Sequence, residues 1–261
     1  DGRGFVNENP ATDIRWTDYG EDYYAAVSWF NLAPGDARRV WIGWINNWRY
    51  AKNVPTAPWQ GAMSIPRQVG LKRMGTDLRL TEQPIAELAA LRGQGYCWND
   101  LALAPGQNPL SELRGTSLEI IAEIECAAAQ VVGFRLRQGV QMGVAVAYDM
   151  QAASIFVDRT GADVLAFDPN FPGKHAAPLD ALGGRIMLHL FLDTCSVEVF
   201  GNDGNVVITD LIFPNPDDDR LELFAVGGTA IMRSLVVYRF GQIQRDVTAG
   251  AAGLTPHPPL L

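Results

Sequence analysis

The stretch IMLHLFLD, residues 186–193, shows the pattern that decides the fold class. Every second side chain is aliphatic and shares one face, and these residues are Ile186, Leu188, Leu190 and Leu192. A period of two is typical of a strand with one buried face. His189 lies on the opposite face, where we expect an ordinary core or surface histidine rather than a ligand.

Comparable strand patterns continue on both sides of this stretch. The further predicted strands are 118–126, 131–137, 142–149, 154–158, 195–200, 205–213, 221–226 and 230–240. Turn sequences such as Gly201-Asn202-Asp203-Gly204 and Gly227-Gly228 separate many of them. Many short strands at near-regular spacing predict a sandwich or a barrel.

The first third of the chain also predicts strands. Residues 23–30 (YYAAVSWF) and 39–48 (RVWIGWINNW) are joined by Pro34-Gly35, which favours a hairpin. A third candidate, 60–71, is interrupted by Pro66.

One short helix is predicted between the two groups of strands. Residues 84–92 (PIAELAALR) place Ile85, Leu88 and Ala89 at helical spacing, and Gly93 follows as a stop. Residues 93–110, rich in Gly, Pro and Asn, predict a linker or loop. We therefore expect an all-β chain with three parts: 1–92, 93–240 and a tail, 241–261.

Composition excludes several function classes. A net charge of −8 disfavours binding to nucleic acid, and no apolar run is long enough for a membrane span. The three cysteines are far apart and form no metal-binding spacing, so we expect buried free thiols, no metal and no cofactor. The first residue is Asp1 rather than Met, and we expect the chain to be part of a longer polypeptide.

Two clusters have side chains suited to sugars. Asp18, Glu21 and Asp22 precede an aromatic strand, where carboxylates accept hydrogen bonds from sugar hydroxyls; the alternative is a solvated turn. The aromatic segments 44–50 and 55–59 hold three Trp, one Tyr and two Asn, and aromatic faces edged by amides suit a sugar ring; the alternative is core. For Asp158, Asp193 and Glu198 we expect structural pairing or exposure.

Several motifs carry a resemblance to a known family. They are DYGEDYYAA (18–26), WIGWINNWRYA (41–51), PTAPWQGAMSIPR (55–67), FVDRT (156–160), FPGKH (171–175), SVEVFGNDG (196–204) and LIFP (211–214). Together they resemble glycoside hydrolase family 32, the family of invertases, levanases and inulinases. The resemblance implies the final part of a five-bladed β-propeller followed by a β-sandwich. It also implies a retaining mechanism with two carboxylates and no cofactor.

The family's catalytic motifs are missing from this sequence. Its nucleophile lies in a W-M-N-D-P-N-G-like motif, its stabilising Asp in R-D-P and its acid/base Glu in E-C, all upstream of the segment that Asp18 begins. Two segments are similar in letters to the E-C and R-D-P motifs but lie in the wrong order and context: Glu125-Cys126 and Phe167-Asp168-Pro169-Asn170. The sequence therefore predicts no catalytic residue in this chain.

The resemblance implies a contribution to substrate binding. The expected residues are Asp18 on fructose hydroxyls, Trp44 in the pocket wall, Trp48 and Asn46 beside it, and Tyr24 either at the rim or in the core. The expected partners are a fructose-containing saccharide and the missing N-terminal propeller segment; a homo-oligomer is compatible with the sequence. If the chain is alone, Trp29, Trp41 and Trp59 should be unusually exposed.

Two functions therefore stand at this point. The first is the C-terminal portion of a retaining β-fructosidase acting on sucrose, levan or inulin. The alternative is a non-catalytic β-sandwich that binds carbohydrate or has a structural role, with residues 1–92 as an appendage.

Overall fold

The structure is a computed structural model that describes residues 3–4, 6, 10, 12, 14–75, 77–140, 143–162 and 167–241. Its elements are almost entirely strands. They are β1 (Tyr24–Ser28), β2 (Arg39–Ile45), β3 (Ala62–Met63), β4 (Arg67–Met74), β5 (Asp77–Pro84), the 3₁₀-helix η1 (Ala86–Leu91), β6 (Arg92–Leu103), β7 (Leu118–Glu125), β8 (Val131–Gln138), β9 (Val144–Asp149), β10 (Ser154–Asp158), β11 (Lys174–Pro178), β12 (Arg185–Leu192), β13 (Ser196–Gly201), β14 (Val206–Leu211), β15 (Arg220–Val226) and β16 (Ala230–Phe240).

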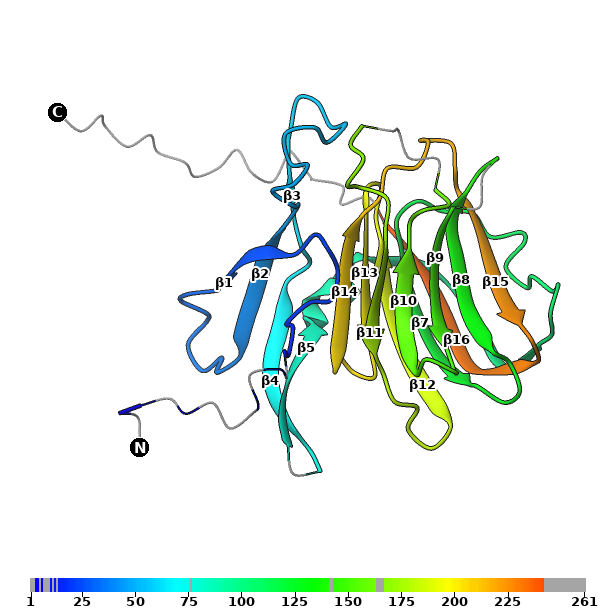
Figure 1. The fold of residues 1–261 in the computed structure, drawn as a ribbon, viewed down its shortest axis with the longest axis horizontal. Coiled ribbons are helices and arrows are strands. Elements are labelled where there is room, and N and C mark those ends of the chain that lie inside the picture. Colours follow the sequence, from blue (N-terminus) through cyan, green and yellow to red (C-terminus); the bar gives the residue numbers. More distant parts are fainter. Residues whose placement is uncertain are drawn as a thin grey trace.

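The strands form three sheets; in Figure 1 the sheet with β1, β2, β4 and β5 lies at the left, and the other two overlap at the right. The outer sheet has the order β1-β2-β4-β5, with β3 paired to β2. A second sheet has the order β11-β10-β9-β8-β15, and a third has the order β14-β13-β12-β7-β16-β6. The second and third sheets share one apolar core and form a sandwich. The chain is therefore all-β, as predicted.

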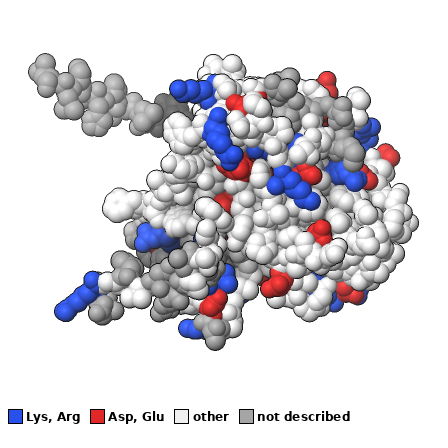
Figure 2. All heavy atoms as spheres, in the orientation of Figure 1, with Lys and Arg blue, Asp and Glu red and all other residues white. Residues whose placement is uncertain are grey.

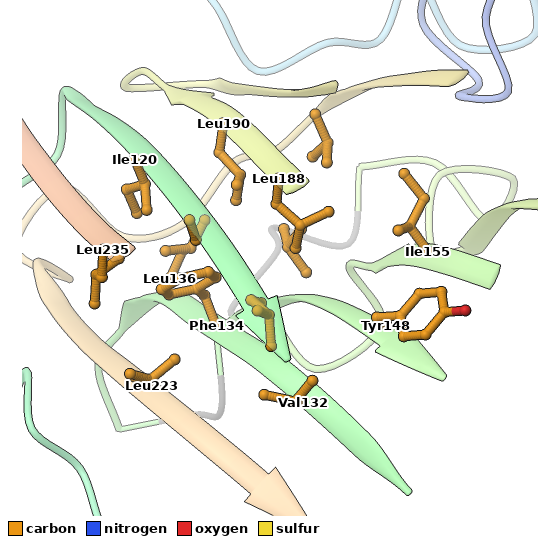
Figure 3. Close-up of a cluster of buried hydrophobic side chains, with 14 of the residues drawn as sticks. Ile120, Val132, Phe134, Leu136, Tyr148, Ile155, Leu188, Leu190, Leu223 and Leu235 are labelled. Carbon is orange, nitrogen blue, oxygen red and sulfur yellow. The ribbon is translucent and has the colours of Figure 1, made fainter. Parts of the chain in front are cut away.

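The sandwich core follows the alternation that the sequence shows. Leu188 and Leu190 of β12 are fully buried and pack with residues of the opposite sheet, such as Phe134 and Ile155 (Figure 3). Two facing sheets of alternating strands bury one side chain in two from each sheet. This core fixes the position of β13 and β14, which lie next to the outer sheet.

Four elements differ from the sequence predictions. The predicted helix is a six-residue 3₁₀-helix, η1, with no buried residue. The predicted loop 93–110 is wrong over its first part, because β6 pairs along its length with β16. Gly95 suits this strand, since a side chain there would meet the Tyr238 ring. Strands β5 and β11 were not predicted. The predicted tail, apart from Gly241, lies outside the described residues.

Residues 18–22 join the outer sheet to the sandwich. The backbone N–H of Tyr19 donates to the Val207 carbonyl at 2.8 Å, and that of Asp22 donates to the Thr209 carbonyl at 3.2 Å. Gly20 makes the close approach possible, because a Cβ there would lie 2.1 Å from the Thr209 carbonyl oxygen. The segment therefore runs against β14 as an irregular extra strand.

The surface carries charges of both signs. On the face in Figure 2, Lys and Arg alternate with Asp and Glu over the described residues, with large uncharged areas between them. No helix in the described part of the chain has the length and hydropathy that a bilayer crossing requires. The three cysteines are unpaired; Cys126 is buried as expected, Cys195 is half-buried, and Cys97 on β6 is exposed, contrary to the prediction.

Candidate functional site

Three aromatic side chains, the exposed Tyr24 and Trp48 and the half-buried Trp44, gather on the outer sheet and are called the aromatic cluster here. The rings of Trp44 and Trp48 have centroids 5.2 Å apart, and Tyr24 meets both edge-on at 6.3 and 6.4 Å. The register places Tyr24 of β1 opposite Trp44 of β2. Tyr24 is 53% exposed and Trp48 is 69% exposed. Such exposure is costly for rings of this size and offers a face for an apolar ligand surface.

The loop before β3 packs closely against the indole of Trp44. Gly61 has a φ of +81°, and a Cβ at this position would lie 2.3 Å from Trp44 Nε1. The loop can therefore follow the indole closely only with glycine here. Trp44 also lies opposite Met63 of β3 in the register. The backbone at Gly61 thus limits where the indole can lie.

Asn46 lies between the two tryptophans in sequence and is buried. Its Oδ1 accepts a hydrogen bond from the Asn47 backbone N–H at 2.8 Å. Its Nδ2 is buried and has no partner among the residues that the structure describes. A buried donor without a partner is costly. The two N–H groups of the Asn46 side-chain amide are therefore available for a ligand or for another part of the protein.

Asp18 lies away from this cluster, at the junction with the sandwich. Its Oδ1 accepts from the backbone N–H groups of Gly20 and Thr209 at 2.8 and 2.9 Å. Its Oδ2 accepts from Arg67 Nη1 at 2.9 Å and from Thr209 Oγ1 at 2.7 Å. With four donors, the carboxylate has no free acceptor site for a sugar hydroxyl. The expectation of a fructose contact through Asp18 is therefore revised to a structural role.

Arg67 is the centre of this junction, and the group of Arg67, Asp18, Glu82 and Glu198 is called the Arg67 cluster. Besides Asp18, Arg67 donates to Glu82 Oε2 at 3.0 Å and to Glu198 Oε2 at 2.7 Å. All four side chains are at most 4% exposed. Burial raises the pKa of Glu82 and of Glu198, against the opposing effect of Arg67. The Tyr23 ring covers the guanidinium at 4.0 Å.

A second buried arginine, Arg159, repeats this arrangement nearby. Its Nη1 donates to Asp22 Oδ2 at 2.7 Å, and Asp22 Oδ1 accepts from the Tyr50 hydroxyl at 2.6 Å. Asp210 lies 3.9 Å from Arg159 and bonds His175 Nδ1 at 2.7 Å. Burial raises the pKa of Asp22, and Arg159 opposes this effect. Both arginines thus bind carboxylates across the junction between the outer sheet and the sandwich.

The acids of these two clusters are bound to arginine and are not open to a ligand. A retaining glycosidase needs two carboxyl groups roughly 5–5.5 Å apart, with a sugar between them. Here the carboxylates that share Arg67 or Arg159 are buried, whereas Glu123 and Glu125 share the partly exposed Arg185. Glu125 pairs with Arg233, and Asp168 accepts from Asn53 and Asn170. Within the described ranges, no three His, Cys, Asp or Glu side chains form a group that could hold a metal ion.

Sequence reasoning missed the role of Arg67 and anticipated that of Glu198. For Glu198 structural pairing was one expectation, and the contact with Arg67 confirms it. Arg67 ends the quoted motif PTAPWQGAMSIPR, where a charged residue after Pro66 carries no sign of full burial. Of the other predictions, Trp29 and Trp59 are exposed as expected, whereas Trp41 is half-buried and donates to Ser28.

Comparisons with known proteins give a consistent result. The model of the glycosyl hydrolases family 32 N-terminal domain matches residues 1–84, and that of the family's C-terminal domain matches residues 87–239. A levanase of Bacillus subtilis is 43% identical over 242 residues, covering 91% of this chain and 36% of the levanase. An extracellular exo-inulinase of Aspergillus awamori is 34% identical over 220 residues, covering 82% of this chain and 40% of that protein.

A solved structure agrees with these matches. The crystal structure of the Aspergillus awamori exo-inulinase superposes with a TM-score of 0.80 at 30% identity. The superposition covers 92% of this chain and 48% of that chain. The chain therefore spans less than half the length of these relatives.

Proposed function

Because the chain belongs to family 32 of the glycosyl hydrolases, we propose that it is the C-terminal portion of a retaining β-fructosidase. The whole protein would hydrolyse terminal fructosyl bonds of sucrose or of the fructans levan and inulin. This portion would supply the scaffold and the rim of the substrate pocket. The names of the levanase and the exo-inulinase support this substrate class.

The observation that carries the proposal is the aromatic cluster on the outer sheet. Trp44 would form part of the pocket wall, with its indole held by Gly61. Trp48 and Tyr24 would offer apolar faces to the C–H surfaces of the sugar. The unpartnered Nδ2 of Asn46 would donate to a sugar oxygen. Binding and orienting the fructosyl unit is the whole of the role proposed for this portion.

The bond-breaking carboxylates would lie in a propeller segment outside these 261 residues. Two observations support this placement. Two carboxylate clusters of the described chain are buried on Arg67 and Arg159. The chain also spans 36% of the levanase and 48% of the exo-inulinase chain. The outer sheet would be part of the five-bladed propeller, whose blades are typically four-stranded.

The contacts at the junction weigh against the alternative of a stand-alone sandwich module. In that case residues 1–92 would be an appendage. Arg67 and Glu82 of the outer sheet instead share a buried ion cluster with Glu198 of the sandwich. Removing the outer sheet would leave Glu198 without its arginine and would uncover the sandwich surface against which this sheet packs. Affinity for fructo-oligosaccharides that survives deletion of residues 1–92 would favour the module.

A chimera tests the proposal directly. In it, this chain replaces the matched 242 residues of the Bacillus subtilis levanase. We expect the chimera to release fructose from at least one of levan, inulin and sucrose, and the 261-residue chain alone to release none. Trp44→Ala in the chimera should raise KM for fructoside by about tenfold or more.

Two results would contradict the proposal. Robust turnover by the chain alone would place the catalytic acids within it. A correctly folded chimera that is inactive on all three substrates would exclude sucrose and fructans as the substrates. Trp29→Ala is the matched control, since Trp29 is also exposed on the outer sheet but lies outside the aromatic cluster.

A further inference from the structure

A groove separate from the aromatic cluster lies between the outer sheet and the sandwich. It has a volume of about 390 Å³ and is called the hairpin groove here. Its walls come from residues 15–19, from the β4–β5 hairpin, and from the turns that follow β11 and β13. In Figure 1 these segments meet beside β14, below the level of β3. Its volume is within the range of small-molecule sites.

The walls of the groove are tied to one another by hydrogen bonds. Arg15 donates to Asp77 Oδ2 at 3.1 Å, which joins the N-terminal segment to the hairpin. The Glu82 backbone N–H donates to the Gly204 carbonyl at 3.0 Å, which joins the hairpin to the turn after β13. Asn202 Nδ2 donates to the Asp180 carbonyl at 2.9 Å, which joins that turn to the one after β11. The groove is thus preformed, which lowers the cost of binding.

One lining residue lacks a hydrogen-bond partner. Asn205 lines the groove, and its Oδ1 is buried with no partner among the described residues. Its backbone N–H donates to the Gly201 carbonyl at 2.9 Å, so the residue is anchored in its turn. A buried, unpartnered acceptor at a groove points to a ligand that brings a donor, such as a hydroxyl group.

The rest of the lining suits a neutral ligand with an apolar face. Trp16 lines the groove and is 63% exposed, although indole is a large apolar group. The two lining arginines, Arg15 and Arg79, share Asp77 at 3.1 Å, and the lining residue Asp180 supplies a second carboxylate. The groove therefore has little net attraction for an anion. An aromatic face, an amide acceptor and paired charges together are typical of a site for a polyhydroxylated ring.

We propose that the hairpin groove is a second, non-catalytic binding site for a neutral fructan oligosaccharide. A sugar ring would stack on Trp16, and one of its hydroxyls would donate to Asn205 Oδ1. The class of saccharide rests on the proposed function, whereas the existence of the site rests on the groove itself. The site would hold a fructan chain while the aromatic cluster receives its end.

The two surfaces are far enough apart to be tested separately. Arg67 lies opposite Trp41 in the register, and Met63 lies opposite Trp44 further along β2. Arg79 of the groove lies opposite Lys72, toward the other end of β4. At about 3.3 Å per residue, the two surfaces are on the order of 20 Å apart along the sheet.

Calorimetric titration of the intact chain with levan oligosaccharides tests the site. Trp16→Ala and Asn205→Ala should each weaken binding by about tenfold, and Trp44→Ala should leave the groove component unchanged. Because Trp16 is exposed, its replacement should keep the thermal midpoint of unfolding. Trp29→Ala is the control for loss of an exposed indole outside both surfaces.

The following outcomes would overturn the proposal of a fructan site in the groove. Unchanged affinity in Trp16→Ala, or no saturable binding by the unmodified chain, excludes a saccharide in the groove. Equal binding of maltohexaose excludes fructan as the ligand class. If Trp44→Ala alone abolishes binding, the groove proposal fails and the proposed function survives. If the chimera is inactive but the titration still depends on Trp16, the proposed function fails and the groove remains a binding site.

Discussion

Arg67 on β4 donates to Glu198 on β13 at 2.7 Å, and neither side chain is more than 4% exposed. This ion pair joins the outer sheet to the sandwich. Because Asp18 and Glu82 bind the same guanidinium, one positive charge serves three buried carboxylates. A buried charge needs a partner, so the two sheets depend on each other for stability.

Removing Arg67 should therefore destabilise the whole chain. Arg67→Met leaves Asp18, Glu82 and Glu198 buried without a cation, and we expect a loss of about 3–5 kcal/mol in the free energy of unfolding. Urea denaturation followed by circular dichroism measures it. Arg38→Met is the control, because Arg38 binds Asp36 and Glu87 at the surface and should matter little. Equal effects of both replacements would contradict the role of the cluster.

The same cluster should make stability depend on pH. Burial raises the pKa of Glu82 above its usual 4.5. A carboxyl with a raised pKa contributes stability that is complete below 4.5 and is lost as the pH rises through the folded-state value. Glu82→Gln removes this titration. The stability of Glu82→Gln relative to the unmodified chain should therefore increase as the pH rises from 4.5.

Denaturant midpoints at a series of pH values measure that difference. Glu87→Gln is the matched control, since the pKa of exposed Glu87 is lowered by Arg38 and its effect has the opposite sign. Parallel stability curves for Glu82→Gln and the unmodified chain would show that Glu82 does not titrate as described.

Replacing Asp18 distinguishes a structural role from a sugar contact. Each carboxylate oxygen of Asp18 accepts two hydrogen bonds. In Asp18→Asn the amide N–H groups would therefore face other donors, whichever way the amide is turned. We expect a loss of about 1–3 kcal/mol in stability. In the levanase chimera, KM should stay unchanged, because a smaller folded fraction lowers only the maximal rate. An unchanged stability with a raised KM would restore the sequence-based expectation of a fructose contact.

Two glycines with positive φ form a matched pair for testing the support of Trp44. An alanine at Gly61 or at Gly35 incurs backbone strain of roughly 1–2 kcal/mol. Only at Gly61 does the new Cβ meet another side chain, because nothing lies within 4 Å at Gly35. Gly61→Ala should therefore cost more stability than Gly35→Ala. It should also change the quenching of tryptophan fluorescence by iodide, which Gly35→Ala should not.

The sequence predicts best where the period of two is strong. The alternation of residues 186–193 matches β12, and the Pro34-Gly35 turn matches the pairing of β1 with β2. β6 was missed because it is the last strand of its sheet, and its Gly93, Gly95 and Asn99 resemble loop residues. β5 alternates as Asp77-Leu78-Arg79-Leu80, but its burial does not follow this pattern, because Leu78 is exposed and the charged Glu82 is buried.

The candidate site was predictable only in part. The tryptophans could be placed on one hairpin from the sequence, and Tyr24, Trp44 and Trp48 do meet there. The role of Asp18 depends on contacts with Thr209, which is 191 positions away along the chain. Local sequence carries no information on such a contact. Only the packing of the outer sheet against the sandwich distinguishes a sugar-binding carboxylate from a junction carboxylate.

The segment 18–22 also protects the sandwich from self-association. It occupies hydrogen-bonding groups of Val207 and Thr209 along β14, the terminal strand of its sheet. A terminal strand with unpaired backbone groups is a template for strand addition by another molecule, and thus for aggregation. Proteolytic removal of the first 92 residues would uncover this edge along with the buried charge of Glu198. The N-terminal third therefore acts as a built-in solubility factor for the sandwich.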